Sequence, residues 1–205
     1  MSNNKINQNE PELILIIGEV AVPAKVDKIN EDIKTILSKK KFSKILCTGN
    51  IGNRETLDFF KGIIKNNSSK NLHIVKSRYD ENDETYPENN VISIGEFNIG
   101  LINGYQITPW DDIYSLRTLQ KTLDADMIVS GFTNKLQVRS LDGIHYLNPG
   151  SLTGAFCPLS NESSPSFILM MAEGSLAIIY TYVYNSSSKS FDINKAEFNK
   201  LKLDE

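Results

Sequence analysis

The sequence predicts a single α/β domain, two-layered or of the sandwich type, with sheets inside and helices outside. Two observations support this prediction. In the first half of the chain, short apolar runs alternate with helical patterns, an order typical of parallel βαβ units with right-handed crossovers. In the second half, apolar runs flank tight turns at Gly95-Glu96 and Glu173-Gly174, which indicates antiparallel hairpins. No internal repeat or obvious linker divides the chain.

The first half is expected to run strand, helix, strand, helix, strand. Residues 13–17 are a continuous apolar run followed by Gly18, typical of a strand buried on both faces. The amphipathic helix after it ends at residues 39–41, three lysines that complement the helix dipole; a basic patch for phosphate or membrane is the alternative interpretation. The apolar positions of this helix are Val26, Ile29, Ile33, Ile36 and Leu37. Strands follow at residues 45–47 and 72–75, with a helix marked by Leu57, Phe60 and Ile64 between them.

The second half begins with strands at residues 91–94 and 97–102. A helix follows, with Asp111 or Asp112 as its N-cap. Strands are then expected at residues 127–129, 144–147, 167–171 and 176–184, and a last one near 191–198; the stretch with Asp142-Gly143 between the first two of these strands reads as a polar connection. Residues 1–11 are expected to be a disordered leader, 12–200 the folded domain and 201–205 a charged tail.

Composition narrows the function classes. With 205 residues, 40% hydrophobic and 23% charged, the chain fits one soluble domain. Its net charge of -3 argues against a general nucleic-acid binder. No apolar run approaches the roughly 20 residues needed to span a bilayer, and no signal peptide is recognisable. The two cysteines, Cys47 and Cys157, show neither metal-type spacing nor a disulfide framework, so a cytoplasmic protein is expected.

The loops at the ends of the predicted strands carry a family resemblance. The turn after residues 127–129 reads SGFTNK, and in calcineurin-like metallophosphoesterases the equivalent turn reads G-H-T-H. Over about residues 12–184 the chain is similar to that superfamily, and more narrowly to the family of vacuolar protein sorting-associated protein 29, a retromer subunit. The narrower resemblance is carried by the motifs ILCTGN (45–50), YDEN (79–82), PW (109–110), NPGS with TGA (148–155) and TYVY (181–184). It implies a calcineurin-like α/β/β/α sandwich.

The resemblance also identifies what the site has lost. Catalytic members hold two metal ions with carboxylates and imidazoles. The seven usual ligand positions are occupied here by Glu19, Ala21, Asn50, Arg78, Asn103, Phe132 and Asn134. One carboxylate and no imidazole remain, alanine and phenylalanine cannot bind metal, and amide oxygens are weak ligands for transition metals. His73 and His145 fall elsewhere and read as structural or surface residues. We therefore expect no metal, no other cofactor and no catalysis.

Arg78 suggests what replaces the metals. It stands at a ligand position of the third loop, and Glu19 is long enough to reach it. The hypothesis is an Arg78–Glu19 ion pair, assisted by Asn50 and Asn103, in place of the dication. The alternative is that Arg78 points to solvent.

Two binding surfaces are implied by the resemblance. The rim of the former metal site is expected to bind the α-solenoid subunit, vacuolar protein sorting-associated protein 35, through Tyr105, Ile107, Thr108, Pro109, Trp110 and Phe132. Family members often carry an aliphatic residue at Thr108, and Trp110 could instead be a core residue. An apolar pocket for proline- and leucine-containing regulator loops is expected at Leu13, Ile36, Lys41, Leu169, Tyr182 and Tyr184. Tyr180, Tyr182 and Tyr184 alternate along one strand and so share a face, which could also be ordinary sheet packing.

The function implied is that of a non-catalytic scaffold subunit of retromer in retrieval of proteins from endosomes to the Golgi and plasma membrane. Such a subunit reaches endosome membranes only indirectly, through the complex. Two alternatives stay open at this point: a phosphoesterase with a reworked metal site, and a pseudoenzyme that binds a small ligand.

Overall fold

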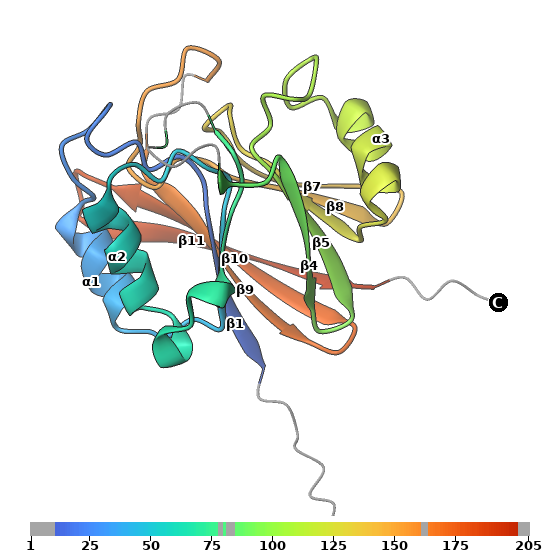
Figure 1. Cartoon of the computed structure of the whole chain (residues 1–205), viewed down its shortest axis with the longest axis horizontal. Coiled ribbons are helices and arrows are strands. Elements are labelled where there is room, and N and C mark those ends of the chain that lie inside the picture. The colour runs from blue at the N-terminus through green and yellow to red at the C-terminus, as the bar shows by residue number, and fades with distance from the viewer. Residues whose placement is uncertain (1–10, 78–79, 81–84, 161–163, 201–205) are drawn as a thin grey trace, which may run out of the picture.

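The structure is a computed structural model, and it describes residues 11–77, 80, 85–160 and 164–200. Two sheets pack face to face with helices outside them (Figure 1). The first sheet has the order β11 (Ser190–Asn199), β10 (Leu176–Asn185), β9 (Ser166–Glu173), β1 (Glu12–Ile17), β2 (Lys44–Cys47) and β3 (Leu72–Ile74). The second has the order β4 (Asn89–Ile94), β5 (Phe97–Ile102), β6 (Met127–Val129), β8 (Ile144–Pro149) and β7 (Leu136–Leu141).

The first sheet combines the parallel strands predicted for the first half of the chain with the antiparallel strands predicted for the second half. β1 pairs in parallel with β2, with Ile14 opposite Lys44, and β2 pairs in parallel with β3. On its other side β1 pairs antiparallel with β9, and β9, β10 and β11 form an antiparallel meander. Both Gly95-Glu96 and Glu173-Gly174 connect paired antiparallel strands, as predicted.

The second sheet contains a strand that the sequence interpretation missed. β7 occupies residues that we read as a polar connection, and it pairs antiparallel with β8 at the sheet edge. An edge strand needs no continuous apolar run, and here Leu136 and Val138 alternate with polar side chains. The remaining pairs, β5 with β6 and β6 with β8, are parallel.

Three helices and two short 3-10 turns connect the strands in the described part of the chain: α1 (Glu31–Ser38), α2 (Arg54–Gly62), α3 (Ile113–Leu123), η1 (Lys65–Asn67) and η2 (Ser69–Asn71). α1 begins later than its apolar pattern suggested, because the Asn30 side chain caps it by accepting from the Asp32 N–H at 2.8 Å. Val26 and Ile29 therefore precede the helix. Asp112 caps α3, as one of the two predicted candidates.

The core divides into three layers. Alternate residues of β1 face opposite ways: Ile14 and Ile16 pack between the sheets, whereas Leu15 and Ile17 pack toward α1 and α2. A third cluster joins α3 to the outer face of the second sheet. The α/β/β/α sandwich implied by the resemblance is therefore confirmed. The expected leader, except Pro11, and the expected tail lie outside the described residues. Across the described part of the chain, the helices are too short or too polar to cross a membrane.

Candidate functional site

The candidate site lies where the carboxyl ends of the strands meet, at the upper edge in Figure 1. Backbone hydrogen bonds hold the loops together there: the Val20 and Ala21 N–H groups donate to the Asn50 carbonyl, and the Gly131 N–H donates to the Asn103 carbonyl. The loops that follow β1, β2, β5 and β6 therefore converge, as expected for ligand-bearing edges of parallel sheets.

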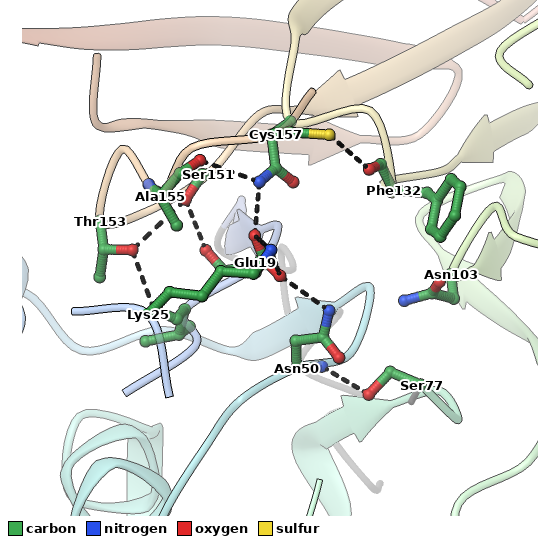
Figure 2. A network of polar contacts seen from close by, with 12 residues as sticks. Glu19, Lys25, Asn50, Ser77, Asn103, Phe132, Ser151, Thr153, Ala155 and Cys157 are labelled. Atoms are coloured by element: carbon green, nitrogen blue, oxygen red, sulfur yellow. Dashed lines mark hydrogen bonds and ion pairs between the residues drawn. The ribbon is translucent and has the colours of Figure 1, made fainter. Parts of the chain in front are cut away.

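A buried carboxylate forms the centre of the site (Figure 2). Glu19 is 5% exposed. The Lys25 ammonium donates to its Oε1 at 2.8 Å and to its Oε2 at 3.1 Å, and the Asn50 Nδ2 donates to Oε1 at 3.1 Å. The Asn134 Nδ2 donates to Oε2. A single carboxylate thus binds side chains from three loops, with one full positive charge among its partners.

Lys25 is the residue that the sequence interpretation missed. Arg78, the expected partner of Glu19, lies outside the described residues. Asn103 makes no contact with Glu19: its Nδ2 donates to the Thr48 carbonyl, and Figure 2 shows it apart from Glu19. Whether it assists Arg78 falls outside the described residues. The six-residue separation between Glu19 and Lys25 lets a short loop close at small entropic cost, but the spacing alone does not specify the turn that brings the two side chains together.

The donors present do not suit a pair of metal ions. The amide nitrogens of Asn50 and Asn134 face Glu19 and donate to it. A cation beside Glu19 would therefore meet N–H groups and not the lone pairs that it needs as ligands. Ala21 and Phe132 have no side-chain donor atom. The Asn50 Oδ1 is buried without a hydrogen-bond partner, but one neutral oxygen beside one carboxylate is far from a full coordination shell. Within the described ranges, no three His, Cys, Asp or Glu side chains gather in a metal-binding arrangement.

The backbone at the former ligand positions is unusual. Ala21, Asn50, Phe132 and Asn134 all have positive φ, at 51°, 55°, 72° and 53°. Asparagine tolerates this left-handed region, whereas it costs other L-residues roughly 1–2 kcal/mol each. Ala21 and Phe132 therefore hold a backbone conformation that is unfavourable for their residue types.

Neighbouring polar groups support that shape. The Asp80 carboxylate, 9% exposed, accepts from the Asn50 N–H at 2.9 Å, the Gly52 N–H at 3.1 Å and the Ser77 hydroxyl at 2.6 Å. The Ser151 hydroxyl donates to the Glu19 carbonyl at 3.0 Å, which fixes the β1 loop from the β8 side. Asp80 and Ser151 belong to the motifs YDEN and NPGS, but the sequence interpretation assigned neither side chain a role of its own.

Apolar side chains surround one side of the site. Trp110 is 50% exposed, and its ring centroid lies 5.3 Å from that of Phe132. The loop after β8 lies against the same turn, because the Asn134 Nδ2 donates to the Ala155 carbonyl at 3.1 Å and the Cys157 thiol donates to the Phe132 carbonyl at 3.5 Å. We call this surface the apolar rim; it is built on the contact between Trp110 and Phe132, and the exposed side chains of Tyr114, Phe156 and Leu159 belong to the adjoining loop and helix segments.

The predicted solenoid-binding residues divide into two groups. Thr108, Pro109 and Trp110 are exposed. Ile107 is not available, because it is 7% exposed and packs in the α3 cluster, and its assignment to a surface is corrected here. The Tyr105 hydroxyl donates to the Glu88 carboxylate, and this hydrogen bond lowers the pKa of Glu88. Tyr114, Phe156 and Leu159, which are 69%, 69% and 42% exposed, were not selected from the sequence, since isolated apolar residues give no periodic signal.

The predicted regulator pocket residues lie on the helix-facing side of the first sheet. Leu13, Ile36, Leu169, Tyr182 and Tyr184 belong to or pack against one core cluster. Their exposure differs: Leu169 and Tyr184 are 5% and 3% exposed, so they form the floor and not the surface. The Tyr184 hydroxyl donates to the Asp32 carboxylate, and that contact raises the pKa of Tyr184.

Two further groups complete this face. Tyr180, Tyr182 and Tyr184 stand opposite Lys195, Ile193 and Phe191 of β11, so the three tyrosines share a face, as predicted. Ile193, 52% exposed, adds an accessible apolar side chain that the sequence interpretation did not select. Lys41 is exposed and donates to the Gly62 carbonyl at the end of α2.

Comparisons with known proteins agree with this architecture. Residues 13–174 match the family model of the calcineurin-like phosphoesterase superfamily domain. The chain is 33% identical over 174 residues to vacuolar protein sorting-associated protein 29 of Schizosaccharomyces pombe, covering 83% of this chain and 90% of the relative. The chain belongs to the vacuolar protein sorting-associated protein 29 (Vps29) family.

Solved structures of Vps29 family members resemble the chain over nearly its whole length. The Entamoeba histolytica Vps29 complexed with Zn²⁺ is 35% identical, with a TM-score of 0.83, and the match covers 91% of this chain and 99% of that one. The Chaetomium thermophilum Vps29 complexed with a cyclic peptide is 28% identical, with a TM-score of 0.79, covering 94% and 99%. The Vps29 family therefore includes a member solved with zinc and a member solved with a peptide.

Proposed function

We propose that this chain is a non-catalytic scaffold subunit of the retromer complex, acting in the retrieval of proteins from endosomes to the Golgi and plasma membrane. Membership of the Vps29 family supports the retromer role. The observation that carries the proposal is the apolar rim, in which a half-exposed Trp110 packs on Phe132 beside the degenerate metal site. Clustered exposed apolar side chains are typical of protein-binding surfaces.

The partner at the apolar rim is the α-solenoid subunit of retromer, vacuolar protein sorting-associated protein 35. Trp110 and Tyr114 are residue types enriched at binding hot spots. Trp110 follows the exposed Pro109, which limits the backbone freedom lost on binding. Retromer assembly then brings the chain to endosome membranes without any membrane contact of its own.

The absence of catalysis is part of the proposal, and the chemistry of the site supports it. Two-metal phosphoesterases need ligands that hold ions and activate water. Here Lys25, Asn50 and Asn134 all donate to the Glu19 carboxylate. The carboxylate is therefore not free to act as a general base, and the four side chains do not form a set of metal ligands. A reworked phosphoesterase is the competing function.

The second surface of the scaffold binds regulators. The partly exposed side chains of Leu13, Ile36 and Tyr182, with Ile193 beside them, offer apolar contacts over a buried floor. A flat apolar sheet face of this kind suits short proline- and leucine-containing loops. The cyclic peptide bound by the Chaetomium relative supports peptide binding as a property of the fold.

Mixing the purified chain with the purified α-solenoid subunit tests the proposal. We expect stoichiometric copurification, no hydrolysis of an aryl phosphate above buffer with added Mn²⁺, and no nucleotide-dependent rise in melting temperature. Metal-dependent hydrolysis would favour the reworked enzyme, and a nucleotide-dependent rise would favour a ligand-binding pseudoenzyme. Failure to copurify would overturn the scaffold role.

A further inference from the structure

The Lys25–Glu19 pair has a role that neither the family nor the sequence assigns. We propose that Lys25 is the resident cation of the degenerate site: its ammonium group neutralises Glu19, holds the loops after β1, β2 and β6 around that carboxylate, and excludes divalent metal. This inference deepens the proposed function, because it explains how a scaffold keeps its loop arrangement without metal. It rests on contacts within this chain and not on the identity of any partner.

The buried carboxylate of Glu19 needs a compensating positive charge. A carboxylate that is 5% exposed must be paired or strongly hydrogen-bonded, since an isolated buried charge is very unfavourable. Lys25 supplies the charge at 2.8 Å and 3.1 Å from the two oxygens of Glu19. The Lys25 side chain is itself 35% exposed, so it pays a smaller desolvation cost than the carboxylate.

A tight turn in the loop after β1 brings Lys25 close to Glu19. Ala21, which stands at a lost ligand position, has a left-handed φ of 51° and starts a tight turn. Its carbonyl accepts from the Lys25 N–H at 2.9 Å and from the Val26 N–H at 3.4 Å. With this turn, the Lys25 ammonium reaches Glu19 from within its own loop (Figure 2).

The polarity of this site is the reverse of that in a metal centre. In a metal centre a cation lies in the middle and the ligands present lone pairs to it. In this chain a carboxylate lies in the middle, and N–H groups of Lys25, Asn50 and Asn134 point inward. A divalent ion entering this site would face three N–H donors, one of them charged, so the inverted arrangement excludes metal.

A double-mutant cycle tests the pairing. Lys25→Met is expected to lower the melting temperature by roughly 4–8 °C for a domain of this size. In the Glu19→Gln background the same change is expected to cost less than half as much, because no carboxylate is left unpaired. Lys25→Arg keeps the charge and is expected to retain most of the stability. Lys28→Met is the matched control, since Lys28 makes only an exposed 3.7 Å contact with Glu31, and it should shift the melting temperature by less than about 1 °C.

Equal effects of Lys25→Met and Lys28→Met, or an equal Lys25→Met loss with and without Glu19→Gln, would overturn the pairing. The metal arm needs no variant: calorimetric titration of the wild-type chain with Zn²⁺ or Mn²⁺ is expected to show no saturable binding, and EDTA no change in melting temperature. Saturable binding that Glu19→Gln removes would overturn the exclusion of metal. These experiments measure stability and metal binding and do not measure solenoid binding. The Lys25–Glu19 proposal can therefore fail while the proposed function holds, and the proposed function can fail while the Lys25–Glu19 proposal holds.

Discussion

The ring of Trp110 lies 5.3 Å from the ring of Phe132, at an interplanar angle of 56°. Phe132 occupies a position that holds a metal ligand in catalytic relatives, and here it supports a half-exposed indole instead. In the proposed function, this turn forms the base of the surface that binds the α-solenoid subunit. The left-handed backbone of Phe132 accompanies two contacts: its ring packs against Trp110, and its carbonyl accepts from the Cys157 thiol.

Trp110→Ala is expected to weaken binding of the α-solenoid subunit at least about 30-fold, which is the effect of a hot-spot residue worth about 2 kcal/mol. Because half of the Trp110 side chain is exposed, the melting temperature should change by less than about 4 °C. Surface plasmon resonance and thermal unfolding measure the two effects. The control is Ile193→Ser, because Ile193 on β11 is an apolar residue about as exposed as Trp110. This substitution should leave solenoid binding unchanged. Equal affinity of Trp110→Ala and wild type would place the interface elsewhere.

The regulator pocket calls for a variant at its accessible surface. Leu169→Asp would bury a carboxylate at a side chain that is 5% exposed, so it would test folding more than binding. Ile193→Asp adds charge at the surface beside Tyr182 and is expected to reduce binding of a proline- and leucine-containing loop peptide at least about 10-fold. Solenoid binding should be unaffected in the same preparation. Unchanged peptide affinity, measured by fluorescence polarisation, would mean that the pocket is mapped wrongly.

The left-handed backbone of Ala21 predicts strong selectivity for side-chain shape at this buried position. A β-branched residue fits poorly at positive φ, so Ala21→Val is expected to lower the free energy of unfolding by more than about 2 kcal/mol. Ala24 is exposed in the same turn, and Ala24→Val should change it by less than about 0.5 kcal/mol. Urea unfolding measures both. Similar values for the two variants would show that the turn relaxes without cost.

Stability should fall on mild acidification because of the two histidines. Burial and the Lys44 charge lower the pKa of His73, and burial lowers the pKa of His145. The unfolded chain, with histidine pKa values of about 6.5, then binds more protons than the folded chain. The free energy of unfolding is therefore expected to decrease as pH falls from about 7 through 6.5 toward the folded pKa values. The variant His73→Gln/His145→Gln should flatten the melting temperature between pH 7.5 and about 5.5. A wild-type profile already flat in that window would contradict this prediction.

Periodicity predicted most of the fold, and its failures have local causes. The continuous run at residues 13–17 indicated a central strand, and it pairs on both sides as β1. β7 was missed because an edge strand with Arg139 and Ser140 lacks an apolar run. α1 was started too early because Val26 and Ile29 have helical spacing, yet the side-chain cap at Asn30 decides where the helix begins.

The site was predicted in outline but not in its contacts. The resemblance predicted the absence of imidazole ligands, because Ala21 and Phe132 stand at two of the usual ligand positions. The pairing of Glu19 with Lys25 was not, because it depends on a turn whose direction is set by one left-handed residue. Ile107 was misplaced for a similar reason: packing under α3, which no local pattern encodes, turns its side chain inward.

Calorimetric titration of the wild-type chain with the purified α-solenoid subunit tests the central claim most directly, performed once in EDTA and once in excess Zn²⁺. We expect one-to-one binding with the same affinity in both buffers, because the apolar rim and the Lys25–Glu19 pair need no metal. Absence of binding in EDTA, or an affinity that rises at least about tenfold with Zn²⁺, would contradict it.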